Sequence, residues 1–186
     1  MNILQDSSLL NFNSFGVNHK SKYLIKIENR DDISNVINNK DIRNEKKLII
    51  GGGSNILFTK DFDGIVLVNK IMGIDKFYED ENIVKIKVGS GENWDEFVSY
   101  CVENSYYGVE NLSLIPGSVG AAPIQNIGAY GQEVSNLIKS VDCYDYINNK
   151  FSTIYIQITF NSHQTTIFSS TWWMRINPYF RWSFNI

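Results

Sequence analysis

Two glycine-rich segments are the parts of this sequence best suited to bind a ligand. The longer one, Ile115–Gly131, reads IPGSVGAAPIQNIGAYG and contains no Lys, Arg, Asp, Glu or His, but it holds four glycines, three alanines and two prolines. A solvated loop would carry charge, and a core strand would carry more Val, Ile and Phe. Small residues let a backbone lie close to a flat or bulky molecule, and glycine adopts positive φ without steric cost. We therefore expect this backbone to lie against a ligand.

The shorter segment, Gly51–Asn55, directly follows the apolar run Lys47–Ile50. A strand that ends in consecutive glycines presents several N–H groups that can converge on an anion such as a pyrophosphate. A tight turn after a buried strand would use the same residue types. Because two such segments occur in one chain, the sequence favours a nucleotide-type cofactor.

The elements that position these segments follow from hydrophobic periodicity. Asp63-Gly64 and Asn148-Asn149 predict turns, and Glu110–Gly131 predicts a long loop without secondary structure, a feature that is itself typical of functional loops. The expected strands are Lys22–Ile27, Lys47–Ile50, Ile65–Val68, Asp75–Tyr78, Ile83–Val88, Val141–Ile147 and Phe151–Ile158. The fourth and fifth of these strands are expected to form a hairpin around Asp80-Glu81-Asn82. In its second strand Val84, Ile86 and Val88 alternate with two lysines, which predicts one buried and one solvated face.

Two helices are expected. The first is short, begins at Asp31 as its N-cap and carries Ile33, Val36 and Ile37 on one face. The second begins after Asn93 as its cap, with Gly108 as a stop signal. Its amphipathic face consists of Trp94, Phe97, Val98 and Cys101. This periodicity makes Trp94 a core residue rather than a side chain that stacks on a cofactor.

Composition excludes several classes of protein. The 186 residues allow one or two small domains, and 17 basic against 20 acidic residues without a basic run argue against nucleic acid as a partner. We expect neither a membrane span nor a signal peptide. Cys101 and Cys143 predict core thiols of a reducing compartment, so we expect a cytoplasmic protein. His19 and His163 have no partner at metal-ligand spacing, so no metal is expected.

The composition changes after Lys150. Residues 151–186 contain no Lys, Asp, Glu or Gly but three of the four tryptophans, and only Arg175 and Arg181 are charged. One interpretation is an aromatic-rich interface or membrane-surface tail. The other, which we favour, is a segment never shaped by folding, as after a shift of reading frame, because its pattern is inconsistent with the preceding domain.

Three motifs of the sequence carry a family resemblance. GGGSN at Gly51–Asn55, GSGENW at Gly89–Trp94 and GVENLSLIPGSVGAAPIQNIGAYG at Gly108–Gly131 resemble UDP-N-acetylenolpyruvoylglucosamine reductase, a flavoenzyme of bacterial peptidoglycan synthesis. The resemblance runs from about Leu10 to about Tyr144, in order and with matching spacing. It implies an α+β FAD-binding fold of the vanillyl-alcohol-oxidase type, with two small α/β subdomains at residues 1–70 and 71–150. Residues 151–186 would then be an aberrant tail, and the C-terminal substrate domain of the family would be absent.

The same resemblance implies the cofactor site. Gly51–Asn55 would hold the FAD pyrophosphate through backbone N–H groups, and Pro116–Gly131 would line the flavin and the rest of the dinucleotide. Without a His in the first loop, FAD would be bound non-covalently. The implied cofactor-binding residues are Gly51, Gly52, Gly53, Ser54, Asn55, Pro116, Gly117, Ser118, Gly120, Ala121, Pro123, Ile124, Asn126, Gly128, Ala129, Tyr130 and Gly131.

In the family reaction, hydride passes from NADPH to the flavin and then to the enolpyruvyl double bond of a UDP-sugar, while an Arg and a Glu stabilise the enolate-like intermediate and a Ser protonates it. Alignment without gaps places Asn161–Gln164 at the family's aromatic-Gly-Tyr-Arg motif, with His163 at the Tyr and Gln164 at the Arg. Since Gln carries no positive charge, we assign no catalytic residue. Three alternatives stay open: the reductase, a truncated or frameshifted remnant that at most binds FAD, and a flavin-binding module completed by a second chain.

Overall fold

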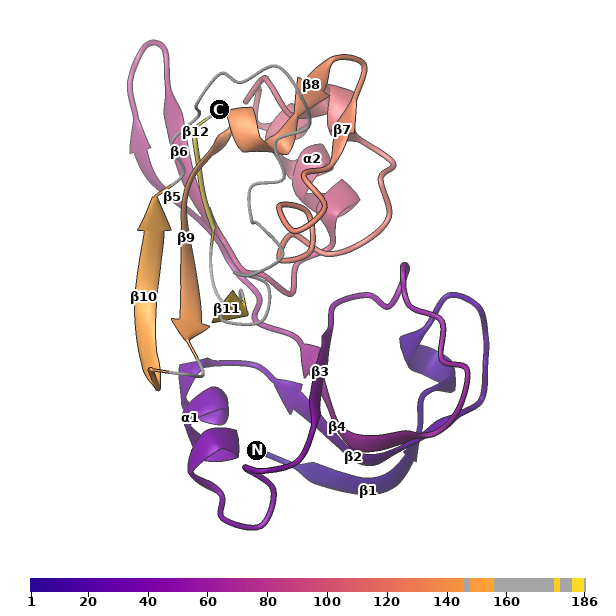
Figure 1. Cartoon of the computed structure of the whole chain (residues 1–186). Coiled ribbons are helices and arrows are strands. Elements are labelled where there is room, and N and C mark those ends of the chain that lie inside the picture. Colours follow the sequence, from indigo (N-terminus) through magenta and orange to yellow (C-terminus); the bar gives the residue numbers. More distant parts are fainter. Residues whose placement is uncertain (146–147, 156–175, 178–181, 186) are drawn as a thin grey trace. The chain divides into compact units, whose positions relative to one another are not determined.

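The structure is a computed structural model that describes residues 1–145, 148–155, 176–177 and 182–185. It divides into two compact units, Met1–Ile71 and Met72–Ile186, each built around its own sheet (Figure 1).

The first unit is a four-stranded sheet in the order β1-β2-β4-β3. β2 and β3 run parallel to β4, whereas β1 is antiparallel to β2. The expected strands of this unit are confirmed, and β1 is an additional strand that the sequence pattern did not predict. The elements are β1 (Ile3–Ser8), the 3-10 helix η1 (Leu10–Phe12), β2 (Lys20–Ile27), α1 (Arg30–Asn38), β3 (Lys47–Ile50) and β4 (Phe62–Asn69).

Two expectations in this unit are wrong. Asn29, not Asp31, caps α1: its backbone is extended, and its side-chain oxygen accepts from the Asp32 N–H at 3.1 Å, while Asp31 lies inside the first turn. Asp63-Gly64 is not a turn but part of β4. A Cβ on Gly64 would lie 2.5 Å from the Lys46 carbonyl oxygen, so this glycine serves close backbone approach within a sheet.

The second unit is an antiparallel sheet in the order β10-β9-β12-β6-β5, with β11 paired to β9. The predicted hairpin is confirmed as β5 and β6, and Val84, Ile86 and Val88 are buried as the alternation predicts. The elements are β5 (Ile74–Glu79), β6 (Val84–Val88), α2 (Trp94–Glu103), η2 (Glu110–Leu112), β7 (Gly128–Ala129), β8 (Gln132–Glu133), η3 (Val134–Asn136), β9 (Ile138–Asp145), β10 (Lys150–Tyr155), β11 (Ile176–Asn177) and β12 (Trp182–Asn185).

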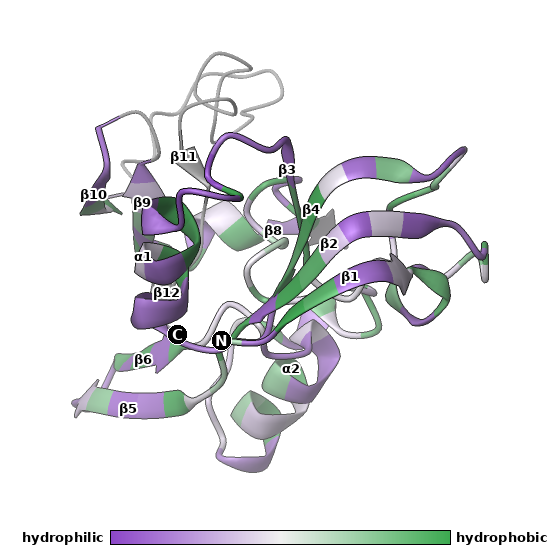
Figure 2. Ribbon diagram, turned by 90° about the horizontal axis from the view of Figure 1, so that it is seen from below, coloured by the Kyte–Doolittle hydropathy of each residue, from purple (hydrophilic) through white to green (hydrophobic). Residues whose placement is uncertain are grey.

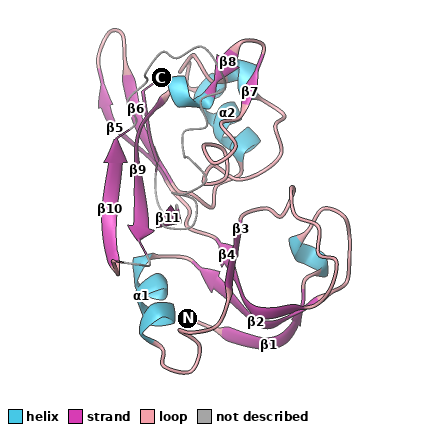
Figure 3. Cartoon of the chain, viewed as in Figure 1, coloured by secondary structure: helices cyan, strands magenta, loops and turns pink. Residues whose placement is uncertain are grey.

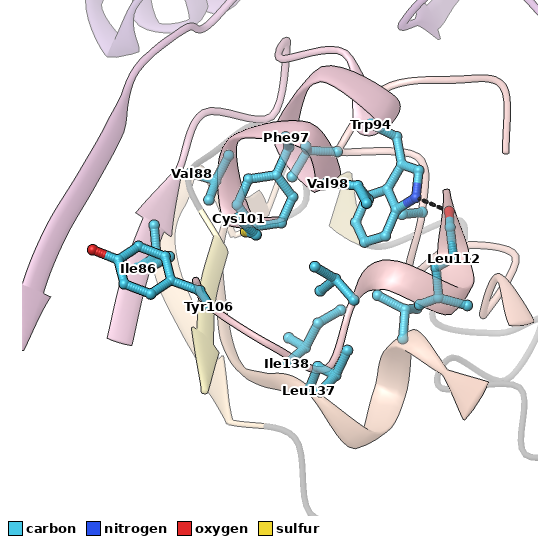
Figure 4. Packing of buried hydrophobic residues seen from close by; sticks show 14 of the residues in the cluster. Ile86, Val88, Trp94, Phe97, Val98, Cys101, Tyr106, Leu112, Leu137 and Ile138 are labelled. Carbon is cyan, nitrogen blue, oxygen red and sulfur yellow. Dashed lines mark hydrogen bonds between the residues drawn. The ribbon is translucent and has the colours of Figure 1, made fainter. Parts of the chain in front are cut away.

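Helix α2 supplies much of this unit's core. The predicted cap is confirmed, since the Asn93 side chain accepts from the N–H groups of Asp95 and Glu96. Polar and apolar residues both occur around the helix (Figure 2), and the predicted face of Trp94, Phe97, Val98 and Cys101 is buried. Trp94 packs edge-on to Phe97 and donates its Nε1–H to the Leu112 carbonyl oxygen at 2.7 Å (Figure 4). Trp94 is therefore a core residue, as predicted.

Two other features of this unit differ from expectation. α2 ends at Glu103, earlier than the expected stop signal at Gly108. At this end the Asn104 N–H donates to the Tyr100 carbonyl oxygen. The segment Glu110–Gly131 is mostly loop (Figure 3) but contains η2 and β7. The predicted strands across the Asn148-Asn149 turn are observed as β9 and β10, whereas residues 146–147 and 156–158 lie outside the described residues.

Parts of the aromatic-rich segment take part in this sheet. β10 pairs with β9, the short strand β11 also pairs with β9, and β12 pairs with both β9 and β6. The remainder of residues 151–186, including the predicted motif positions His163 and Gln164, lies outside the described residues.

Candidate cofactor-binding site

The first glycine loop begins where β3 ends at the buried Ile50. Gly53 is the residue of this loop that the protein itself requires to be glycine. Its φ is +71°, and a Cβ there would lie 2.1 Å from the Phe12 carbonyl oxygen. The Ser14 N–H also donates to the Gly53 carbonyl oxygen at 3.2 Å. The end of β3 is thus held against the connection between β1 and β2.

Gly52 is a glycine for which the protein has no such need. It is exposed, its φ lies outside the left-handed region, and a Cβ there would meet no atom within 4 Å. Moreover, none of the backbone N–H groups from Gly51 to Ser54 donates to an acceptor in the part of the chain that the structure describes. Successive N–H groups of this kind form a concave site for an anion. The loop therefore fits a pyrophosphate approached closely by backbone.

The second loop starts with residues tied to the segment before α2. Gly117 has a φ of +134°, and its carbonyl oxygen accepts from the Trp94 N–H at 3.1 Å. Ser118 is buried and forms a β-bridge with Asn93. Gly120 donates to Ser90 at 2.9 Å, and a Cβ there would lie 2.8 Å from the Ser90 Cβ. These residues position the loop on the second unit.

Most N–H groups in the middle of this loop are used by the protein. Those of Gly120, Ala121, Ile124 and Asn126 donate to the carbonyl oxygens of Ser90, Ser118, Ala121 and Pro123 respectively. Pro116 and Pro123 have no N–H. A ligand would therefore contact these predicted site residues through side chains, carbonyl oxygens or Cα atoms rather than through amide donors, unlike the first loop.

The end of the second loop is a hairpin with an exposed aromatic tip. β7 and β8 are joined by Tyr130 and Gly131, whose φ values of 53° and 82° are those of a primed two-residue turn. Tyr130 is 91% exposed. Asn126 also has a positive φ, of 44°, and its side chain donates to Glu133 at 2.9 Å. Left-handed backbone at a non-glycine residue costs roughly 1–3 kcal/mol and gathers at functional sites, so this tip is a candidate ligand contact.

The predicted site residues therefore fall in both units: Gly51–Asn55 lie in Met1–Ile71, and the others lie in Met72–Ile186. The β1–β2 connection that contacts Gly53 was not among the predicted site residues. The turn-forming residues Asn13, Ser14 and Gly16 were a signal for an ordered loop there.

The described residues offer few other candidates for a nucleophile or a metal ligand. The thiols of Cys101 and Cys143 are free and buried, as predicted. Burial raises the pKa of Cys101 to about 12 and also raises the pKa of Cys143, which makes both poor nucleophiles. Within the described ranges, His, Cys, Asp and Glu form no cluster that could hold a metal ion. The helices that the structure describes include none that is both long and apolar enough to cross a membrane.

Comparison with known proteins identifies the domain. The FAD binding domain family matches residues 21–148. The UDP-N-acetylenolpyruvoylglucosamine reductase of Amoebophilus asiaticus is 42% identical over 171 residues, which is 92% of this chain and 50% of that protein. The enzyme of that name from Porphyromonas gingivalis is 44% identical over 146 residues, 78% of this chain and 43% of that protein. The chain thus spans about half the length of the curated relatives it matches.

Solved structures support the fold. UDP-N-acetylenolpyruvylglucosamine reductase from Thermus caldophilus has a TM-score of 0.61 at 19% identity, covering 83% of this chain and 52% of that one. Aclacinomycin oxidoreductase has a TM-score of 0.59 at 10% identity, covering 82% and 33%. At these identities the likeness bears on the fold, and it confirms the predicted α+β FAD-binding fold. The sequence relatives confirm the resemblance that the motifs predicted. With its family match over most of its length and its homology to UDP-N-acetylenolpyruvoylglucosamine reductases, the chain belongs to the FAD binding domain family.

Proposed function

We propose that this chain binds FAD non-covalently and that the N–H groups from Gly51 to Ser54 receive the pyrophosphate. The observation that carries the proposal is the state of the first loop: its amide donors have no acceptor among the described residues, and Gly52 faces open space. Four amide dipoles directed at one anion supply a favourable electrostatic site without a charged side chain. Asn55 completes the loop, and no residue of it is a His that could be linked to flavin.

The second loop would bind the flavin and the remainder of the dinucleotide. Its small residues from Pro116 to Ala129 allow close approach, and the exposed turn of Tyr130 and Gly131 offers a contact at its end. The rigid attachment of Gly117 and Gly120 to the segment Gly89–Trp94 supports this role, because a binding surface held by hydrogen bonds loses little entropy when a ligand binds.

For the protein to which this sequence corresponds, we propose FAD- and NADPH-dependent reduction of UDP-N-acetylenolpyruvoylglucosamine to UDP-N-acetylmuramate in peptidoglycan synthesis. The names of the relatives support this substrate and reaction. Bound FAD would supply hydride chemistry, and the described residues would bind and orient it. The partners are then a small-molecule UDP-sugar and NADPH, and the buried free thiols support a cytoplasmic setting.

The variant Gly52→Ala tests the proposed site. Since a Cβ at position 52 meets nothing and the backbone is not left-handed, the unliganded variant should unfold at the same urea concentration as the wild type. In titrations followed by flavin fluorescence, FAD affinity should fall, because the methyl group stands where the pyrophosphate approaches. Unchanged FAD affinity in a variant of unchanged stability would place the pyrophosphate elsewhere, and failure of the folded wild type to bind FAD would overturn the function.

A second assay separates the alternatives for activity. The FAD-loaded chain is mixed with NADPH and UDP-N-acetylenolpyruvoylglucosamine, and NADPH absorbance is followed. Oxidation that depends on the UDP-sugar supports the reductase in this chain itself. FAD binding without such oxidation supports either a truncated or frameshifted remnant that binds FAD or a flavin-binding module completed by a second chain.

A further inference from the structure

We propose that Asn13 is a positioning residue for the pyrophosphate loop: it fixes the β1–β2 connection, Leu9–His19, in the shape that holds Gly53 and its neighbouring N–H groups. This inference rests on the proposed function, because it assigns the support of the same site. Asn13 belongs to neither of the segments from which the cofactor site was predicted.

Asn13 is a buried amide. Among the described residues, its side chain forms hydrogen bonds only to the backbone of its own loop. It is 8% exposed. Its Nδ2 donates to the carbonyl oxygens of Leu9 at 2.7 Å and Val17 at 3.0 Å, and its Oδ1 accepts from the Val17 N–H at 3.0 Å. One side chain thereby joins the two ends of the segment Leu9–Val17. A buried group with this many partners fixes a loop more strongly than a surface bond does.

The base of the same loop is closed by other bonds. The Leu9 N–H donates to the His19 carbonyl oxygen at 2.7 Å. Asp61 accepts from the Lys20 N–H at 2.9 Å and lies 3.2 Å from His19 Nδ1. With its base closed in this way, the shape of the loop above it depends on Asn13.

The loop transmits this shape to Gly53 through backbone atoms. A Cβ on Gly53 would lie 2.1 Å from the Phe12 carbonyl oxygen and 3.1 Å from the Asn13 Cα, and the Ser14 N–H bonds to the Gly53 carbonyl oxygen. The residues on either side of Asn13 therefore touch the pyrophosphate loop directly. Loss of the Asn13 amide would loosen the backbone on either side of it that contacts Gly53, and with it the position of the N–H groups of Gly53 and Ser54.

The test compares Asn13→Ala with Asn18→Ala. The Asn18 side chain is an exposed amide of the same loop, and it accepts a hydrogen bond from the Ser8 hydroxyl rather than from a residue that contacts Gly53. FAD affinity is measured by flavin fluorescence at a low temperature at which urea curves show each protein to be folded. We expect Asn13→Ala to weaken FAD binding roughly tenfold or more, the size expected when a buried hydrogen-bonded group is removed, and Asn18→Ala to leave it unchanged. At saturating FAD the absorbance spectrum of the bound flavin should match the wild type, since Asn13 acts on the pyrophosphate end.

The outcomes are separable. Equal FAD affinity of folded Asn13→Ala and the wild type would overturn the inference while leaving the proposed function intact. Failure of the wild type to bind FAD would overturn the proposed function itself. If Asn13→Ala does not fold, hydrogen exchange on the wild type decides: FAD must slow exchange of the Val17 amide as well as those of Gly51–Ser54, and protection of the glycine loop without protection of Val17 would refute the coupling.

Discussion

The backbone of Gly120 lies directly against Ser90: its N–H donates to the Ser90 carbonyl oxygen at 2.9 Å, and a Cβ on Gly120 would come within 2.8 Å of the Ser90 Cβ. Ser90 is fully buried, so it has little room to move. We expect Gly120→Ala to lower the free energy of unfolding by about 1–3 kcal/mol, the usual cost of overpacking. Urea denaturation measures this, with Gly52→Ala as the control in open space. Equal stability of the two variants would contradict the close contact.

The proposed pyrophosphate site predicts a charge effect at Gly52. The variant Gly52→Asp places a carboxylate beside the bound anion, and repulsion of roughly 1–4 kcal/mol at close range should weaken FAD binding by about fivefold to a thousandfold. Gly52→Asn has a similar size without the charge and should bind FAD more tightly than Gly52→Asp, with a difference that shrinks at high salt. Equal affinities of the Asp and Asn variants in fluorescence titrations would rule out an anion at this position.

Trp94 predicts the opposite pattern, a loss of stability without a loss of cofactor affinity. Trp94→Phe keeps an aromatic ring but removes the donor to the buried Leu112 carbonyl oxygen. An unpaired buried carbonyl costs about 1–3 kcal/mol, which denaturation would measure. FAD affinity of the folded variant should be unchanged, because the indole is buried in the core. A large loss of FAD affinity at full folding would mean that Trp94 contacts the cofactor.

The buried thiols predict low reactivity and an alkaline loss of stability. In the native protein Cys101 and Cys143 should resist a thiol reagent at neutral pH and react at once after unfolding. Because burial raises the pKa of Cys101 to about 12, the folded state holds this proton more tightly than the unfolded state, whose thiol pKa is about 8.5. The stabilisation is therefore full below that pH and is lost as pH rises toward 12. Cys101→Ala should show a shallower alkaline decline, and an identical decline would refute this origin.

Strand β10 predicts the effect of shortening the chain. Phe151 packs on Tyr144 with ring centroids 4.8 Å apart, and the Ser152 carbonyl oxygen lies 3.5 Å from Cys143 Sγ. Both shortened chains lack β12, which pairs with β9, so comparing them isolates β10: a chain that ends at Lys150 should expose Cys143 to a thiol reagent more than a chain that ends at Tyr155 does. This matched pair differs only by the residues of β10 after Lys150. Equal protection of Cys143 in both chains would show that β10 does not cover β9. Better solubility of the shorter chain would favour the interpretation that the residues from Phe151 onward are not part of the fold.

The sequence by itself determined the features that depend on neighbours along the chain. Asn93 and the apolar residues of α2 lie within three turns, so one periodic pattern specified both the cap and the buried face. The alternation in β6 likewise specified its buried side. The glycine loops were recognisable because their composition fits neither solvent nor core, and the motifs within them were sufficient to predict the family.

Only the tertiary structure decided why each glycine is there. Gly53, Gly64 and Gly120 avoid clashes with Phe12, Lys46 and Ser90, residues distant from them in sequence, whereas Gly52 avoids none. The sequence could not separate these cases, because the same residue type serves a close backbone approach and an open ligand site. Asn13 was missed for the same reason: a turn-forming residue shows its burial and its link to Gly53 only when β3 and the β1–β2 connection are brought together in space.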